Sequence, residues 1–282
     1  MSRVWRRYVA IGDSFTEGMS DPDPAHPDDP DRFRGWADRL ADLLAADLAA
    51  TDPDGAFGYA NLAVRGRLLH DVVTRQLDAA LAQHPDLVSI VGGGNDILRA
   101  KADIDALAQR LEQAVATIRA TGADVLMATP TDPRGAPLVQ RTRGRAAVYT
   151  AHIHSIARRH GAFVVHQWGL TFLQDWRMWA QDRIHMTAEG HRRVAEAAHA
   201  ALQGRTVTGE WATPLPPLTP LPRRDQLEAD VQWAREHLLP WATRRLRGAS
   251  SGDRLGAKRP LLTVVERADR PERPDAERPT AR

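Results

Sequence analysis

The amino-acid sequence predicts an α/β fold in which a mostly parallel sheet is covered by helices on both faces. Two observations support this prediction. Apolar runs of strand length alternate along the chain with longer stretches whose apolar residues recur at helical spacing. The clearest run, residues 87–91, is almost continuously apolar, which is typical of a strand buried on both faces. In such sheets, active sites gather in the loops beyond the carboxyl ends of the strands.

The expected elements follow from these patterns in chain order. Trp36, Leu40 and Leu44 fall on one face of the first long helix. The clearest helix begins after Asp103, a candidate N-cap, and ends before Gly122. The expected strands are residues 8–11, 57–64, 87–91, 125–128 and 163–165, and the expected helices are residues 36–44, 68–82, 104–118, 144–159 and 187–202.

A change in composition divides the chain into two parts. Residues 206–222 contain five prolines and show no periodicity, which is typical of an extended linker or strap. Residues 227–238 carry a short helical stripe, and from about Ala268 onward prolines alternate with charges, as in disordered segments. We therefore expect one compact domain over residues 1–205. Residues 206–282 are expected to form a proline-rich strap, a short helix and a disordered basic tail.

Composition excludes several classes of protein. The absence of cysteine rules out disulfides, thiolate nucleophiles and cysteine zinc sites. No apolar run approaches the ~18–20 residues of a membrane span, and the N-terminus lacks the apolar stretch of about 7–15 residues of a secretory signal. A cytoplasmic location without integral membrane association is therefore expected. The net charge of +2 gives no reason to expect a nucleic-acid partner, although residues 223–282 carry 14 Arg or Lys against 10 Asp or Glu.

Four polar segments follow the predicted strands or precede the last helix, and together they suggest serine chemistry. Ser14 comes directly after the first strand, and Asp182 and His185 come shortly before the last helix. A serine hydroxyl is a weak nucleophile that needs an adjacent base, which His185 can supply. Asp182 is three residues from His185 and can orient the imidazole and stabilise its protonated form.

The same strand ends also offer donors for an oxyanion. Attack of a hydroxyl on an ester carbonyl creates a negatively charged oxygen that needs preorganised hydrogen-bond donors. The candidates are the backbone N–H of Ser14, the backbone N–H of Gly66 and the side-chain amide of Asn95. Gly66 has no Cβ, so its backbone can approach a substrate closely.

The segments GDSFTEG, NLAVRG, GGGND and DRIHMTAEGH resemble, in order, the four sequence blocks of the GDSL-type, or SGNH, serine hydrolases. The resemblance covers about residues 8–202. It implies a flavodoxin-like, three-layer α/β/α fold with a mostly parallel five-stranded sheet. It also implies Ser14 as nucleophile, His185 as base with Asp182 behind it, and Gly66 and Asn95 as oxyanion donors. The implied activity is hydrolysis of small or lipid-like acyl esters without metal or cofactor.

Two details of the motifs concern the shape of the loops. Asp13 and Asp96 occupy motif positions that we interpret as loop-shaping. Met186 stands where many members of the family have proline, which should loosen that loop slightly without removing a functional group.

Other interpretations of the same residues remain open. An acyltransferase, a thioesterase or a carbohydrate acetylesterase would use the same groups, and a non-catalytic binding protein or a nucleic-acid protein organised around the basic tail is a more distant alternative. Ser14 alone could cap a helix, and the glycines 92–94 could hold a phosphate. The tryptophans at 168, 176 and 179 could line an acyl pocket or pack their loop, and the histidines at 152, 154, 191 and 199 are expected on the surface or in packing roles. The acyl chain length, the alcohol and the oligomeric state are left open.

Overall fold

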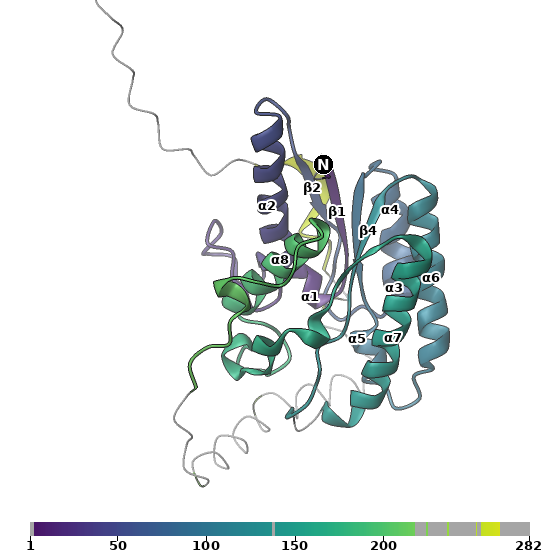
Figure 1. Cartoon of the computed structure of the whole chain (residues 1–282), viewed down its shortest axis with the longest axis vertical. Helices are drawn as coiled ribbons and strands as arrows, with labels where there is room; N and C mark the ends of the chain where they lie inside the picture. Colours follow the sequence, from purple (N-terminus) through teal and green to yellow (C-terminus); the bar gives the residue numbers. More distant parts are fainter. Residues whose placement is uncertain are drawn as a thin grey trace, which may run out of the picture.

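The structure is a computed structural model that describes residues 3–136, 139–217 and 255–265, together with the single positions 224, 236 and 252. Its centre is a six-stranded sheet with strand order β5-β4-β3-β1-β2-β6 (Figure 1). The strands are β1 (Arg7–Gly12), β2 (Gly58–Asn61), β3 (Leu87–Val91), β4 (Asp124–Ala128), β5 (Phe163–Val165) and β6 (Arg259–Val264).

The first five strands are parallel and run in the order 2-1-3-4-5 from the β2 edge, which is the flavodoxin-like arrangement. The predicted α/β fold class with a mostly parallel sheet is confirmed. All five predicted strands are present, and those at residues 87–91 and 163–165 have the predicted bounds.

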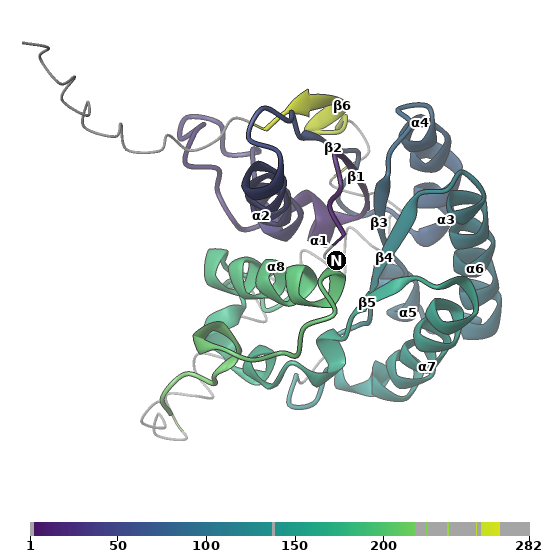
Figure 2. The ribbon, with the colours of Figure 1, turned by 45° about the horizontal axis from the view of Figure 1, so that its top comes forward.

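The expected number of five strands is wrong, because the sheet has a sixth. Strand β6 pairs antiparallel with β2, with Tyr59 opposite Thr263, and closes that edge of the sheet. Figure 2 shows it beside β2, far along the chain from its partner. It comes from the segment 206–282, where no strand was predicted. The short helix and the disordered tail expected in that segment lie outside the described residues.

Helices cover both faces of the sheet, as predicted (Figure 2). One face carries α2 (Gly35–Thr51) and α8 (Ala188–Leu202), which pack on each other. The other carries α3 (Leu69–Asp71), α4 (Leu77–Leu81), α6 (Ile104–Ala120) and α7 (Arg143–His160). The side chain of Asp103 accepts a hydrogen bond from the backbone N–H of Ala106 at 3.0 Å, which confirms the predicted cap of α6.

The predicted helix over residues 68–82 is interrupted by a π-helical turn, Val72–Gln76, between α3 and α4. This π-helical turn contributes to the fold through the side chain of Gln76. Its amide donates to the carbonyl of Gly12 at 2.9 Å and accepts from the Gly12 N–H at 2.8 Å, so it pairs with the end of β1. This end of β1 leads directly into α1 (Ser14–Glu17).

The connection from α1 to α2 depends on a close backbone approach. Gly18 ends α1 with a φ of 96°, and Gly35 begins α2 with a φ of 79°. A Cβ on Gly18 would lie 2.5 Å from the Cα of Gly35, so no other residue fits without movement. This contact fixes the short helix that carries Ser14 against the long helix α2. No helix in the described part of the chain is long and apolar enough to cross a membrane.

Candidate active site

Three of the predicted side chains lie in one hydrogen-bonded row at the carboxyl end of the sheet. Ser14 is the first residue of α1, and its Oγ is 3.1 Å from Nε2 of His185. Nδ1 of His185 is 2.5 Å from Oδ2 of Asp182. A carboxylate can only accept, so Nδ1 carries a proton and Nε2 is left to accept from the serine hydroxyl.

Asp182 is held as an anion in this row. Burial pushes its pKa upward, but the hydrogen bond and charge of His185 and the backbone N–H groups of Ile184 and His185 outweigh burial. The pKa of Asp182 therefore lies below the usual range. Its Oδ1 accepts from both of those N–H groups at 2.9 Å, which fixes the carboxylate while Oδ2 faces the imidazole.

Backbone hydrogen bonds within the loop before α8 hold His185 in position. The N–H of Ala180 donates to the carbonyl of His185 at 2.8 Å, and the N–H of Thr187 donates to the carbonyl of Met178 at 2.9 Å. Gly190 lets the loop pack closely, since a Cβ there would lie 2.5 Å from the Met178 carbonyl. Met186, expected to loosen the loop, is 3 % exposed, and its backbone forms an isolated antiparallel β-bridge with Trp179. The loop is thus held by burial where proline is absent.

The structure brings Asn95 into contact with Asp13, the residue before Ser14. Asn95 Nδ2 donates to the carbonyl of Arg67 at 3.0 Å and makes a longer contact, 3.4 Å, with Asp13 Oδ2. The longer contact is weak, so that N–H can turn toward a substrate oxygen. Ser14 and Asn95 line the cavity described below, whereas Gly66 does not. Gly66 has a φ of 75°, which favours glycine.

A buried ion pair positions the segment that contains Gly66, and the sequence analysis missed it. The Glu17 carboxylate accepts from the backbone N–H of Arg65 and from its Nη2, both at 2.6 Å. Both side chains are less than a tenth exposed. Opposite charges in GDSFTEG and NLAVRG, at the ends of two neighbouring parallel strands, were the signal that could have revealed the pair.

Asp13 shapes the start of α1, as expected for a loop-shaping residue. Its Oδ1 accepts from the backbone N–H of Phe15 at 3.1 Å and so caps the helix. Burial raises its pKa from 3.8 to about 6. Asp96 accepts from the N–H of Leu69 at 2.9 Å, and burial raises its pKa as well. These carboxylates join the motif loops to one another.

The raised pKa of Asp13 predicts a pH-dependent cost in stability. Because the folded chain disfavours the ionised carboxylate, the cost appears as pH rises from about 4 to about 6 and reaches up to about 3 kcal/mol above that. We expect Asp13→Asn to raise the free energy of unfolding near pH 7.5 and to change it little near pH 4. Urea titrations at both pH values measure this, with the exposed Asp28→Asn as control. An equal effect at both pH values would contradict it.

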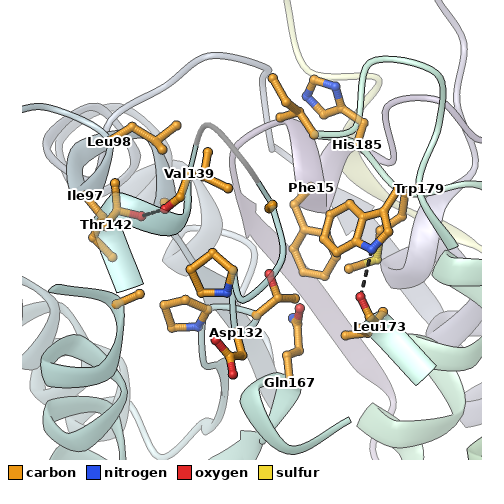
Figure 3. Close-up of a pocket in the computed structure, with 18 of the residues that line it drawn as sticks. Phe15, Ile97, Leu98, Asp132, Val139, Thr142, Gln167, Leu173, Trp179 and His185 are labelled. Carbon is orange, nitrogen blue, oxygen red and sulfur yellow. Dashed lines mark hydrogen bonds between the residues drawn. The ribbon is translucent and has the colours of Figure 1, made fainter. Parts of the chain in front are cut away.

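A cavity of about 290 Å³ extends from this row of side chains into the protein (Figure 3). Ser14, Asn95 and His185 are among its lining residues. Trp176 and Trp179 also line it, whereas Trp168 is not among its lining residues and packs instead beneath the guanidinium of Arg143, 5.6 Å away. Two of the three tryptophans therefore lie where an acyl pocket was considered, and the third packs its loop.

The four histidines expected on the surface or in packing roles have partners in neighbouring side chains or the backbone. His152 is 2.8 Å from Asp105, His154 is 3.0 Å from His166, and His199 is 2.7 Å from Asp47. Among the described residues, no group of three or more His, Asp or Glu side chains could hold a metal ion.

His191 is buried next to the nucleophile helix. Its Nδ1 accepts from the backbone N–H of Trp36 at 3.2 Å, and its Nε2 lies 3.3 Å from the carbonyl of Met19. Its ring stacks against Phe15. Burial lowers its pKa to about 4, so the ring is neutral at physiological pH and donates from Nε2. His191 therefore has the packing role expected for it.

Comparisons with known proteins agree with this architecture. The sequence model of the GDSL-like lipase/acylhydrolase family matches residues 10–193. No curated protein matches the chain. Among solved structures, a catalytic mutant of Axe2, an acetylxylan esterase from Geobacillus stearothermophilus, has 20% identity and a TM-score of 0.58 and covers 75% of this chain and 98% of its own.

Two further solved structures are similar in fold. TesA has 24% identity and a TM-score of 0.54, over 71% of this chain and 99% of its own. LAE5, an alpha/beta hydrolase enzyme from the metagenome of Lake Arreo, Spain, has 24% identity and a TM-score of 0.56, over 72% of this chain and 98% of its own. At these identities the likeness concerns the fold.

Proposed function

Because the chain belongs to the GDSL-like lipase/acylhydrolase family, and is on that ground a carboxylic ester hydrolase, we propose that it cleaves small acyl esters by way of an acyl-enzyme on Ser14. The observation that carries this proposal is the row of hydrogen bonds from Ser14 Oγ to His185 at 3.1 Å and from His185 to Asp182 at 2.5 Å. A hydroxyl, a base and an orienting carboxylate in that order constitute the arrangement that activates a serine.

The first half of the reaction forms the acyl-enzyme. His185 Nε2 takes the proton of Ser14 as Oγ bonds to the carbonyl carbon, and the electron pair of the C=O bond moves onto oxygen. Asp182 stabilises the imidazolium that results. When the C–O bond to the alcohol breaks, His185 gives the proton to the departing oxygen. The acyl group then remains on Ser14 as an ester.

The second half releases the acid by the same groups. His185 removes a proton from water, whose oxygen bonds to the acyl carbon, and the proton returns to Ser14 Oγ as the ester bond breaks. In both halves the negative oxygen would bind the N–H of Ser14, at the open end of α1, together with the donors of Gly66 and Asn95. The substrate is a small-molecule ester.

Asn95→Ala tests the oxyanion role. We expect kcat to fall about 10²–10³-fold with a much smaller change in KM, because the donor acts mainly when charge develops on the oxygen. Steady-state kinetics on a 4-nitrophenyl ester measure both constants. A variant with unchanged kcat and a raised KM would show instead that Asn95 serves ground-state binding.

The proposal itself is tested by product analysis. The purified chain should release 4-nitrophenolate from short-chain esters and yield the free acid as the main acyl product, with or without an added alcohol or sugar. Absence of turnover on every acyl chain from acetyl to octanoyl would overturn the proposal. A predominant transfer of the acyl group to the added alcohol would identify an acyltransferase instead.

A further inference from the structure

Gln167 is a buried polar side chain that the proposed reaction does not use. It begins the short helical turn after β5, Gln167–Gly169, and it is 4 % exposed. It lines the cavity, and Figure 3 shows its side chain extending into that space. Within the part of the chain that the structure describes, no other residue hydrogen-bonds to this side-chain amide, which faces the cavity and is not sealed inside the protein. An amide that faces a cavity without a partner from the protein can donate to and accept from a ligand group there.

Three other polar side chains that line the cavity have partners within the protein. The carboxylate of Asp132 accepts from Arg143 at 2.7 and 3.0 Å, so its charge is compensated. The hydroxyl of Thr129 accepts from the backbone N–H of Trp168 at 3.0 Å. Gln174 Nε2 donates to the carbonyl of Asp132 at 3.0 Å. The amide of Gln167 is itself neutral and both donates and accepts, so a neutral group that does the same suits it.

Apolar walls separate Gln167 from the reacting groups. In Figure 3, Phe15 and Trp179 lie on one side of the cavity, and Ile97, Leu98 and Val139 lie on the other. His185 lies at one end, and Gln167 lies toward the opposite end. A molecule that reaches both ends must be apolar between them.

The position of His185 indicates which part of an ester enters the cavity. In the proposed reaction His185 protonates the alcohol, so the alcohol lies on the His185 side and must leave from there. Trp176 lines the cavity and is 44% exposed, and Arg183, two residues before His185, holds its guanidinium over that ring at 5.5 Å, so we infer that the cavity reaches the surface near His185. The acyl group is then directed inward, toward Gln167.

We propose that the substrate is an ester whose acyl chain is apolar near the carbonyl and carries a neutral hydrogen-bonding group, a hydroxyl or a carboxamide, which Gln167 binds. This inference rests on the proposed function and adds the chemical class of the acyl group. Gln167 acts here as a specificity-determining residue. It binds the far end of the chain and takes no part in bond breaking.

Paired substrates test this inference. For each chain length from butanoyl to octanoyl, kcat/KM is measured on three 4-nitrophenyl esters. One has an unsubstituted acyl chain, one has a terminal hydroxyl on that chain and one has a terminal carboxamide. We expect the native chain to prefer a substituted ester at one or two chain lengths by about tenfold, the effect of one buried hydrogen bond. Gln167→Leu and Gln167→Met should abolish that preference, measured within each variant as the ratio of kcat/KM for the substituted ester to kcat/KM for the plain ester. Gln140→Leu, at an exposed position, is the control and should keep it.

The outcomes separate this inference from the proposed function. Plain esters turned over with no preference for a substituted chain, or a preference that survives in both Gln167 variants, would overturn the inference alone. No turnover of any ester would overturn the proposed function. In that case, stabilisation against heat by the free hydroxy acid still tests the site. The native chain should be stabilised more by the hydroxy acid than by the plain acid, and equal stabilisation would overturn the inference.

Discussion

Replacing Ser14 with alanine is expected to lower kcat for a 4-nitrophenyl ester by about 10⁴–10⁶-fold while the chain stays folded. The alanine removes the only atom that can form the acyl-enzyme proposed here. The small activity that remains would come from the oxyanion donors and from binding of the ester. The fold should tolerate the change, because the cap of α1 is supplied by Asp13.

Three measurements test this prediction: the rate of turnover, circular dichroism and the thermal midpoint. Rates are compared for the native chain, Ser14→Ala and Ser155→Ala, the last being an exposed serine of α7 that donates to the carbonyl of Ala151. Circular dichroism and a thermal midpoint check that each variant is folded. Undiminished turnover by a folded Ser14→Ala would remove Ser14 from the reaction, and equal losses in both variants would point to a non-specific effect.

Asp182→Asn should have the second largest effect, a fall in kcat of about 10⁴-fold. The amide oxygen of the new side chain can still accept from the N–H groups of Ile184 and His185, so the loop keeps its shape. The NH₂ of that amide then faces Nδ1 of His185 and makes this nitrogen an acceptor. The proton moves to Nε2, which can no longer take the proton of Ser14. The fall in kcat therefore comes from the change in the tautomer of His185.

The chain offers a matched control for this variant. Asp105 and His152 form a second Asp–His pair, 2.8 Å apart, whose residues do not line the cavity. Asp105→Asn should leave kcat within about twofold of the native value, as surface changes usually do. If Asp182→Asn behaved like Asp105→Asn, the carboxylate would have no orienting role. The dependence of kcat on pH adds a check. Because the pKa of Asp182 is lowered, its carboxylate stays ionised throughout the neutral range, and its titration should leave no step in that range.

The sequence predicted the main body of the fold because its signals are local. Strands such as residues 87–91 are almost continuously apolar, and α6 has both its cap at Asp103 and a glycine, Gly122, just beyond its end. The site residues could be named because each follows a predicted strand or precedes the last helix. Their roles stay proposals, although the structure brings Ser14, Asp182 and His185 together.

The sixth strand could not be placed in the same way. Residues 261–265, Leu-Leu-Thr-Val-Val, do carry a β signal, but pairing with β2 links positions about 200 residues apart. A second long-range contact precedes this strand. Lys258 Nζ donates to the carbonyls of Glu17 at 2.6 Å and Phe33 at 2.7 Å and to the carboxylate of Asp38 at 2.6 Å. The C-terminal segment thus anchors the helix that carries Ser14, a link that no local pattern reveals.

Two features of the site depend on tertiary contacts and were not predicted from the sequence. The pairing of Glu17 with Arg65 and the orientation of Gln167 depend on how separate loops meet at the end of the sheet. Gln167 is one of several glutamines in the sequence, and its place on the cavity wall becomes visible only once the walls are assembled. For this reason the proposed class of acyl group is argued from the cavity and not from the motifs.

Mass spectrometry of the acid-quenched reaction tests the central claim most directly. The native chain is mixed with a 4-nitrophenyl ester, quenched within the first turnovers and digested. The peptide that contains Ser14 should carry the mass of the acyl group, and the matching peptide of Ser14→Ala should not. An acyl group found on another residue, or turnover in which no acylated peptide forms even after rapid quenching, would contradict the acyl-enzyme on Ser14.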